Sequence, residues 1–159
     1  MNLNSKSTYS IVSKSPEDTI RIGQKLSAEL KPGDVLGLTG DLGAGKTCLV
    51  KGIVMGLGGD DVVTSPTFVI MHRYQVDVPV NHLDLYRMET ANLTEFGYED
   101  FKDSGITVIE WAEKASNLEL EDIILISFDI LNQSERRLNI IFSKNFPDQR
   151  IFQIKQMFS

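Results

Sequence analysis

The sequence predicts a single α/β domain: a three-layer sandwich in which a mixed parallel and antiparallel central sheet is flanked by helices. Three observations favour this class. The apolar run Val35–Thr39 is followed by a glycine-rich loop and then by an amphipathic segment, which is the order strand, loop, helix. The run Ile106–Ile109 has the composition of a second buried parallel strand. Two pairs of alternating segments predict hairpins, and hairpins add antiparallel strands to the sheet.

The length and composition of the chain are those of an ordinary globular protein with one domain. The chain has 159 residues, enough for one domain with a sizeable core, and 42% of them are hydrophobic and 24% charged. The net charge of -6 disfavours a free-standing nucleic-acid binder, although it is compatible with a local basic patch. Cys48 is the single cysteine, so an internal disulfide is excluded. Because residues 1–9 are polar and no apolar run is long, we expect no secretory signal, no membrane span and a cytoplasmic location.

The loop Gly40–Thr47 fits the spacing G-x-x-x-x-G-K-[ST] of a phosphate-binding loop. Its glycines allow a tight turn whose N–H groups point inward at an anion, and Lys46 adds a positive charge. The Thr47 hydroxyl is placed to ligate Mg²⁺, and the helix that starts there directs its positive end at the phosphates. A chance match is disfavoured because a strand precedes the loop and a helix follows it. We therefore expect a P-loop NTPase-like fold. The predicted nucleotide contacts are Asp41, Leu42, Gly43, Ala44, Gly45, Lys46, Thr47 and Cys48.

The elements around this loop follow from capping signals. Thr8–Ser13 is expected to form a short strand. A helix then begins with Ser15 as its N-cap and Pro16 as its first residue, and it ends at Lys31–Asp34. The helix after the phosphate loop is expected over Lys46–Leu57, where a group of glycines ends it.

Val62–Phe68 has hydroxyl side chains grouped around a proline between two apolar runs, downstream of the phosphate loop. This pattern is typical of a switch segment that responds to a γ-phosphate, with Thr64, Ser65 and Thr67 as its polar groups. A plain turn that leads into the next strand explains the same residues equally well.

Phe68–Val76 and Val80–Met88 alternate in polarity and predict an antiparallel hairpin. In the second strand, His82, Asp84 and Tyr86 share the side opposite the leucines. A carboxylate between a histidine and a tyrosine is suited to bind water or a metal ion. An exposed strand face gives the same pattern, and the residues alone leave both interpretations open.

Leu93–Lys102 is expected to be a surface helix. After it comes the apolar strand Ile106–Ile109, directly followed by Glu110 and Trp111. Phosphate-loop enzymes use an acid at the end of a strand to hold Mg²⁺ or to polarise the attacking water. The alternative is that Glu110 caps the brief helix expected over Trp111–Ser116.

The end of the chain predicts a second hairpin and a tail. Residues 124–130 and 138–142 alternate in polarity on either side of a turn at residues 132–134. Beside this turn, Arg136 and Arg137 are either solvated charges or contribute a guanidinium to a nucleotide or a partner. We expect residues 1–142 to form the phosphate-loop domain. The apolar side chains of residues 143–159 indicate a tail docked on the same domain.

Four segments together resemble the TsaE (YjeE) family: Gly40–Thr47, Ser65–Phe68, His82–Arg87 and Ile109–Glu113. They occur in the family's order and spacing, and the match covers about residues 8–142. The resemblance implies a Mg²⁺-dependent ATPase required for threonylcarbamoyladenosine, a tRNA modification next to the anticodon. It implies that the protein acts with TsaB and TsaD, leaves the group transfer to TsaD, reaches tRNA only through that complex, and does not involve a membrane.

The resemblance also implies roles for single residues. Lys46 would grip the β- and γ-phosphates, while Thr47 and Glu110 would hold Mg²⁺ with Asp84 assisting the metal or the water. Lys46, Asp84 and Glu110 are thus the expected catalytic residues. Thr64, Ser65 and Thr67 match the family's switch segment.

Trp111 is the aromatic residue that the family's motif places beside the acid. The alignment is looser at Ser15 and at Arg136 or Arg137, where Ser15 and one of the two arginines, Arg136 first, are expected to border the base or a partner. The chain departs from the family's pattern at Cys48, where a second Thr or Ser is usual, and in the tail after Phe142, which matches no motif of the family.

Two other functions compete with this interpretation. A stand-alone small-metabolite kinase would have a similar length, but the sequence has no arginine-rich lid, and hairpins occupy the region where such kinases place substrate-binding helices. A GTP-dependent switch is disfavoured because the guanine signature N-K-x-D is absent and the D-x-x-G at Asp34–Gly37 precedes the loop. We expect slow hydrolysis without partners, since no obvious arginine finger lies near Glu110.

Overall fold

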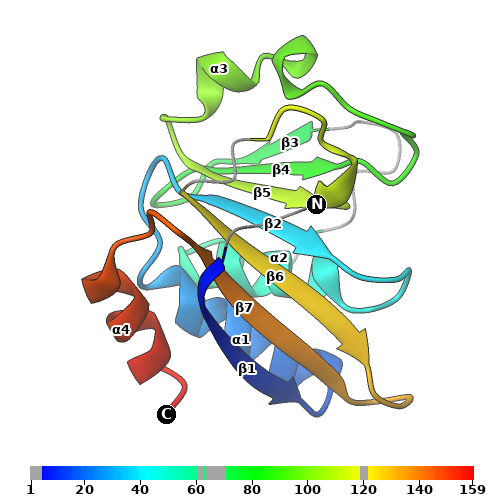
Figure 1. Cartoon of the computed structure of the whole chain (residues 1–159), viewed down its shortest axis with the longest axis vertical. Coiled ribbons are helices and arrows are strands. Elements are labelled where there is room, and N and C mark those ends of the chain that lie inside the picture. Colours follow the sequence, from blue (N-terminus) through cyan, green and yellow to red (C-terminus); the bar gives the residue numbers. More distant parts are fainter. Residues whose placement is uncertain (1–4, 61–62, 64–70, 119–121) are drawn as a thin grey trace.

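The computed structural model describes residues 5–60, 63, 71–118 and 122–159 (Figure 1). The strands in this part of the chain form one seven-stranded sheet in the order β1-β7-β6-β2-β5-β4-β3. Their bounds are β1 Ser5–Ser13, β2 Val35–Thr39, β3 Met71–Tyr74, β4 Val80–Asp84, β5 Ile106–Glu110, β6 Ile123–Ile130 and β7 Arg136–Ser143. β2 is parallel to β5 and β6, and β4 is parallel to β5. The pairs β1–β7, β6–β7 and β3–β4 are antiparallel, so the predicted mixed sheet is confirmed.

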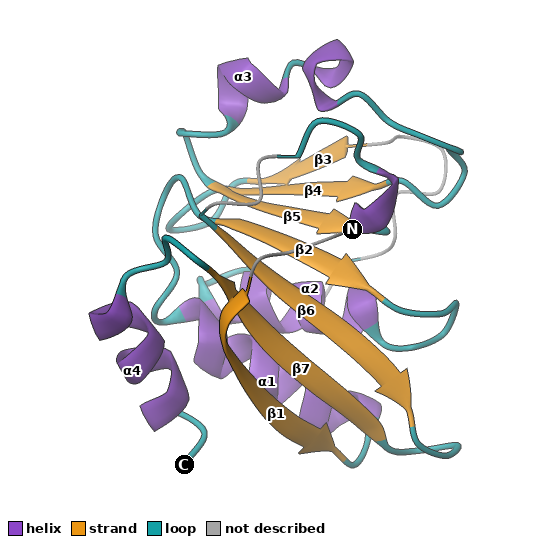
Figure 2. Ribbon diagram, viewed as in Figure 1, coloured by secondary structure: helices purple, strands orange, loops and turns teal. Residues whose placement is uncertain are grey.

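The helical segments cover the two faces unequally (Figure 2). Their bounds are α1 Pro16–Ser27, α2 Lys46–Gly56, η1 Leu93–Phe96, α3 Tyr98–Phe101, η2 Ala112–Lys114 and α4 Asp148–Gln156, where η marks a 3-10 helix. One core cluster joins α1, α2 and α4 to one face of the sheet. A second cluster joins Leu83 of β4 and Ile109 of β5 to η1, α3 and η2 on the other face. The result is the predicted three-layer α/β fold. None of the helices described is long and apolar enough to cross a membrane.

Two glycines bring α1 and α2 into backbone contact. A Cβ atom at Gly23 of α1 would collide with the carbonyl of Leu49, and a Cβ at Gly52 of α2 would collide with the carbonyl of Ile20. Only glycine permits this approach. It anchors α2, and with it the phosphate loop, against α1.

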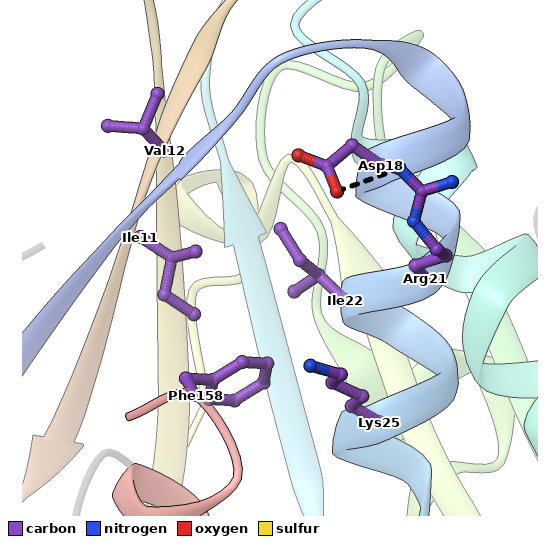
Figure 3. Close-up of a pocket in the computed structure, with 7 residues that line it drawn as sticks. All are labelled: Ile11, Val12, Asp18, Arg21, Ile22, Lys25 and Phe158. Carbon is purple, nitrogen blue, oxygen red and sulfur yellow. Dashed lines mark hydrogen bonds and ion pairs between the residues drawn. The ribbon is translucent and has the colours of Figure 1, made fainter.

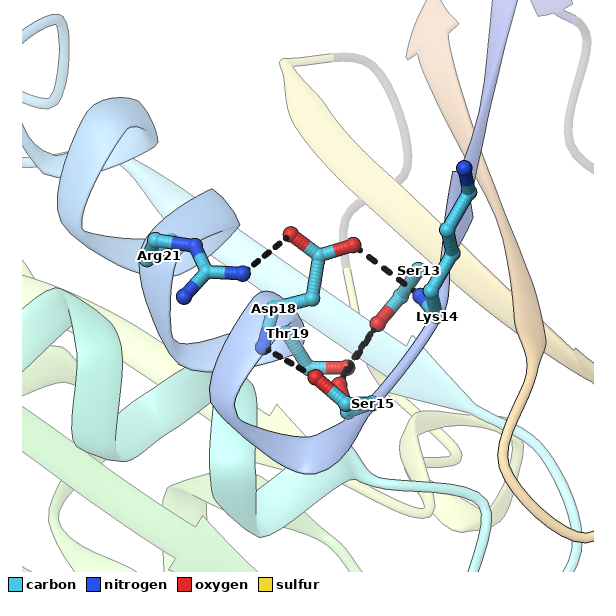
Figure 4. Close-up of polar contacts among 6 residues, drawn as sticks. All are labelled: Ser13, Lys14, Ser15, Asp18, Thr19 and Arg21. Atoms are coloured by element: carbon cyan, nitrogen blue, oxygen red, sulfur yellow. Dashed lines mark hydrogen bonds and ion pairs between the residues drawn. The ribbon is translucent and has the colours of Figure 1, made fainter.

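The turn between β1 and α1 is tied by side-chain hydrogen bonds (Figure 4). Ser15 Oγ accepts from the Asp18 N–H at 3.0 Å, which makes Ser15 the N-cap of α1 as predicted. Asp18 in turn accepts from the Lys14 N–H at 3.0 Å and from Arg21 Nη2 at 3.2 Å. Ser13 Oγ donates to the Ser15 carbonyl at 2.9 Å, so the turn is held from both sides.

The observed elements differ from the predicted ones at several boundaries. The helix predicted over Leu93–Lys102 is two short pieces, because Gly97 adopts a left-handed conformation with φ 77° and separates η1 from α3. The strand predicted over Val80–Met88 ends at Asp84, after which the Met88 N–H donates to the Leu85 carbonyl in a turn. The helix predicted over Trp111–Ser116 is only the 3-10 turn η2. Of the strand predicted over Phe68–Val76, the described part is Met71–Tyr74.

The C-terminal tail packs on the sheet through α4. Phe146, Ile151 and Ile154 are buried in the same core cluster as α1 and α2. Arg150 donates to both carboxylate oxygens of Asp34, at 2.8 and 2.6 Å, and to the Glu29 carbonyl at 2.8 Å. The tail therefore contacts the segment that leads from α1 into β2.

Candidate functional site

The phosphate loop connects the carboxyl end of β2 to α2. Three of its glycines have positive φ angles: 144° at Gly40, 77° at Gly43 and 104° at Gly45. A Cβ at Gly40 would lie 2.9 Å from both Cβ and the carbonyl oxygen of Phe128, so the loop packs closely on β6. The predicted glycine positions are therefore the ones that the backbone needs to curl at the end of β2.

Lys46 is the first residue of α2, and only 4% of it is exposed. Its Nζ donates to the carbonyls of Gly40 at 2.6 Å and Asp41 at 3.0 Å, and it lies 4.3 Å from the centre of the Trp111 ring. Burial lowers the pKa of Lys46, although the nearby carboxylates, Glu110 first among them, act in the opposite direction. The ammonium group is thus held in the curve of the loop, away from most of the solvent.

Thr47, Glu110 and His82 form a buried network beside this lysine. Thr47 Oγ1 donates to Glu110 Oε1 at 2.8 Å, and His82 Nε2 lies 3.1 Å from the same oxygen. Glu110 is 3% exposed and His82 is fully buried. Because β4 and β5 are parallel, and β5 is parallel to β2, their carboxyl ends meet the phosphate loop at one edge of the sheet. The predicted metal-binding pair Thr47 and Glu110 is therefore brought together.

Asp84 lies at the last position of β4, directly opposite Glu110 in the register of the two strands. It is partly buried, its Oδ1 accepts from the Tyr86 N–H at 3.0 Å, and its charge acts on Lys46. The exposed-face interpretation of this strand is wrong, because β4 is interior to the sheet and His82 is fully buried. Asp84 and Glu110 instead form a pair of acids at the carboxyl ends of β4 and β5.

Trp111 has an unusual backbone. Its φ of 57° is the only positive φ of a non-glycine residue in the described part of the chain. A bulky residue in this conformation typically costs about 1–3 kcal/mol, and such strain collects at functional sites. Here the conformation places the ring over Lys46 and 5.1 Å from the Tyr86 ring, while Lys114 Nζ lies 5.1 Å from the indole. The indole thereby covers the ammonium group on one side.

The remaining predicted positions have separate places in the structure. Arg136 Nη2 donates to the Gly43 carbonyl at 3.3 Å, so the β6–β7 hairpin reaches the phosphate loop. Ser15 serves as the cap of α1, and in the loop Leu42 is 69% exposed. Burial raises the pKa of the Cys48 thiol, which suits a small packing residue and not a thiolate. The proposed switch residues Thr64, Ser65 and Thr67 lie outside the described residues.

From the sequence, His82 is predicted only as part of a polar strand face, and its contact with Glu110 is not predicted. The signal that would have found it is the alternation of β4 combined with the pairing of β4 and β5. His82 and Asp84 are two residues apart on one face, next to a strand that ends in an acid. The pairing itself is visible only in the structure.

A pocket of about 210 Å³ lies elsewhere, between β1, α1 and the C-terminal residues (Figure 3). It is lined by Ile11, Val12, Asp18, Arg21, Ile22, Lys25 and Phe158. None of these residues belongs to the phosphate loop or to the Thr47–Glu110–His82 network. The pocket is therefore distinct from the candidate site.

Comparisons with known proteins identify the family of this chain. A family model described as "Threonylcarbamoyl adenosine biosynthesis protein TsaE" matches residues 13–138. The tRNA threonylcarbamoyladenosine biosynthesis protein TsaE of Treponema pallidum is 37% identical over 133 residues, covering 81% of this chain and 97% of the relative. The protein of the same name from Aquifex aeolicus is 32% identical over 133 residues, covering 82% and 93%. The crystal structure of Bacillus subtilis YdiB superposes with a TM-score of 0.76 at 30% identity, covering 94% of this chain and 95% of YdiB. The chain belongs to the TsaE family.

Proposed function

We propose that this protein is a Mg²⁺-dependent ATPase in the biosynthesis of threonylcarbamoyladenosine in tRNA, acting in the cytoplasm with TsaB and TsaD. Membership of the TsaE family supports the role in this tRNA modification. In the proposed scheme, the protein does not transfer the threonylcarbamoyl group itself and meets tRNA only through its partners. The observation that carries the ATPase proposal is the convergence of Lys46, Thr47 and Glu110 at the carboxyl end of β2.

The residues at this edge fit a nucleotide with its metal ion. The buried carboxylate of Glu110 and the hydroxyl of Thr47 are oxygen donors, which Mg²⁺ prefers, and they already lie 2.8 Å apart. Asp84 supplies a further carboxylate in register with Glu110. When bound, Mg²⁺ would neutralise charge on the phosphate oxygens.

The chain's own groups would then act as follows. The backbone N–H groups of the loop and the start of α2 bind phosphate oxygens, and Lys46 supplies positive charge from a desolvated position. Glu110 and Asp84 orient the metal and the attacking water. Trp111 excludes water from one side of the lysine.

The contacts of Arg136, which bonds to the phosphate loop, support the proposed need for partners. Arg136 donates to the carbonyls of Asn132 at 2.7 Å, Glu135 at 3.0 Å and Gly43 at 3.3 Å. Its guanidinium therefore holds the hairpin against the loop. We propose that the charge which completes transition-state stabilisation comes from the partner complex, so that hydrolysis by the lone protein is slow.

The test is ATP turnover by the purified protein, alone and with TsaB and TsaD, using Lys46→Ala and Glu110→Ala as controls. The proposal expects stimulation by the partners and its loss in both variants. No hydrolysis in the presence of both partners would contradict the proposal. Turnover that instead requires a small hydroxylated acceptor, without partners, would indicate a kinase.

A further inference from the structure

His82 lies on the same face of the sheet as the phosphate loop. On β4 it is paired with Val108 of β5, one alternation before the Asp84–Glu110 pair. It is fully buried. Its ring and that of Tyr74 are stacked, with their centroids 6.2 Å apart. Polar side chains that are buried this deeply are usually hydrogen-bonded to another group of the protein.

The direction of this hydrogen bond depends on the tautomer of the imidazole. With Glu110 as a carboxylate, which can only accept, His82 Nε2 carries the hydrogen and donates it across the 3.1 Å contact. Nδ1 has no hydrogen-bond partner in the described part of the chain. His82 thus leaves one ring nitrogen unsatisfied in the core while the other holds Glu110.

Both hydrogen bonds to the carboxylate end on the same oxygen. Thr47 Oγ1 and His82 Nε2 donate to Glu110 Oε1, one from α2 and the other from β4. Two donors from different elements fix the orientation of the carboxylate plane. Oε2 has no hydrogen-bond partner among the described residues, which makes it the oxygen available to a metal ion or water.

We infer that His82 is a positioning residue, which holds the Glu110 carboxylate so that Oε2 is directed to Mg²⁺ and the attacking water. This inference rests on the proposed ATPase function. Partners of metal ligands that do not touch the metal typically contribute about 10-fold to 100-fold in metal affinity or activity. The same loss is expected when the His82 donor is removed.

Three variants separate this role from packing. His82→Phe keeps a ring beside Tyr74 and removes the donor. His82→Gln keeps an N–H at a similar distance along the side chain. Thr107→Val is the matched control. Like His82, Thr107 is fully buried and has a polar atom without a partner among the described residues. Unlike His82, it lies on the face of the sheet opposite to Glu110.

The experiment measures ATP turnover against Mg²⁺ concentration, and ATP binding with Mg²⁺ or with EDTA from the fluorescence of Trp111, which lies beside Lys46. For His82→Phe, we expect turnover and Mg²⁺ affinity to fall by about 10-fold to 100-fold, with binding in EDTA unchanged. His82→Gln should recover most of the loss, and Thr107→Val should behave as wild type.

The outcomes distinguish the two proposals. If wild type neither binds nor hydrolyses ATP, the proposed function fails. If wild type is active and His82→Phe keeps its Mg²⁺ dependence, or loses binding equally with EDTA, the role of His82 fails. Should the variants not fold, the ¹⁵N spectrum of the wild-type imidazole decides: a proton on Nε2 supports the inference, and an Nε2 without a proton overturns it.

Discussion

A cationic side chain lies at each end of β2, Arg150 partly buried and Lys46 almost fully buried, and the two settings differ. At the amino end, Arg150 forms a two-point ion pair with Asp34, at 2.8 and 2.6 Å, and also donates to a backbone carbonyl. At the carboxyl end, Lys46 donates to two backbone carbonyls and lies over an aromatic ring. The charge of Arg150 is matched by Asp34. Among the residues that the structure describes, Lys46 instead donates its hydrogen bonds to the carbonyls of Gly40 and Asp41.

We propose that this difference separates an architectural cluster, Arg150 with Asp34, from a binding cluster, Lys46 with Thr47 and Glu110. A buried guanidinium paired with a carboxylate stabilises one arrangement of the fold. Lys46 forms no such pair in the described part of the chain, and burial lowers its pKa even though nearby carboxylates, Glu110 first among them, act in the opposite direction. An incoming polyphosphate would place negative charge in direct contact with Lys46. The variants below test this contrast.

The largest effect is expected for Lys46→Ala. Because a single preorganised electrostatic contact in an active site typically contributes 10²–10³-fold, turnover with partners should fall by about 10³-fold. The fold should survive, since the variant removes a desolvated charge. Turnover assays combined with thermal melting check both parts. A variant that unfolds at much lower temperature than wild type would place Lys46 among the architectural residues.

Arg150→Ala should act on stability in the opposite way. It leaves Asp34 buried without its counter-charge, and breaking such a pair costs about 3 kcal/mol. Chemical denaturation measures this loss. Arg150→Met combined with Asp34→Asn is the control, because it removes both charges and should recover part of the stability. ATP turnover per folded molecule should remain that of wild type.

Glu110→Gln tests the acid of the binding cluster while preserving its shape. We expect turnover to fall by about 10²-fold, since the amide is a poor ligand and cannot polarise water as a carboxylate does. Nucleotide binding should be retained better than hydrolysis. Single-turnover kinetics and fluorescence titration separate the two quantities. Wild-type turnover in this variant would remove Glu110 from the catalytic role.

Ser15→Ala gives the smallest expected effect. Loss of the Ser15 Oγ bond to the Asp18 N–H uncaps α1 and should destabilise the protein by about 1 kcal/mol. Thermal melting detects this change. If turnover also fell, the predicted contact of Ser15 with the base or a partner would gain support over a purely capping role.

More residues of the binding cluster than of the architectural cluster are predictable from the sequence. Lys46 and Thr47 are specified by local spacing, and Glu110 by its place at the end of an apolar strand. The Arg150–Asp34 pair joins residues 116 positions apart, and no local pattern links them. His82 needed the register of β4 against β5, and the positive φ of Trp111 is a tertiary constraint that no propensity predicts.

The fold class was predictable because strand and helix periodicities are local. The boundaries that failed are places where one residue overrides the pattern. Gly97 breaks the helix predicted over Leu93–Lys102, and the turn after Asp84 ends a strand whose alternation continues in the sequence. The close contact of Gly23 and Gly52 likewise depends on how two helices pack.

The most direct test of the contrast is calorimetric titration of Mg²⁺-ATP into wild type, Lys46→Ala and Arg150→Ala under one set of conditions. We predict one site in wild type, near-complete loss of affinity in Lys46→Ala, and wild-type affinity in the folded fraction of Arg150→Ala. Equal affinity of Lys46→Ala and wild type would contradict the assignment of the carboxyl end of β2 as the nucleotide site.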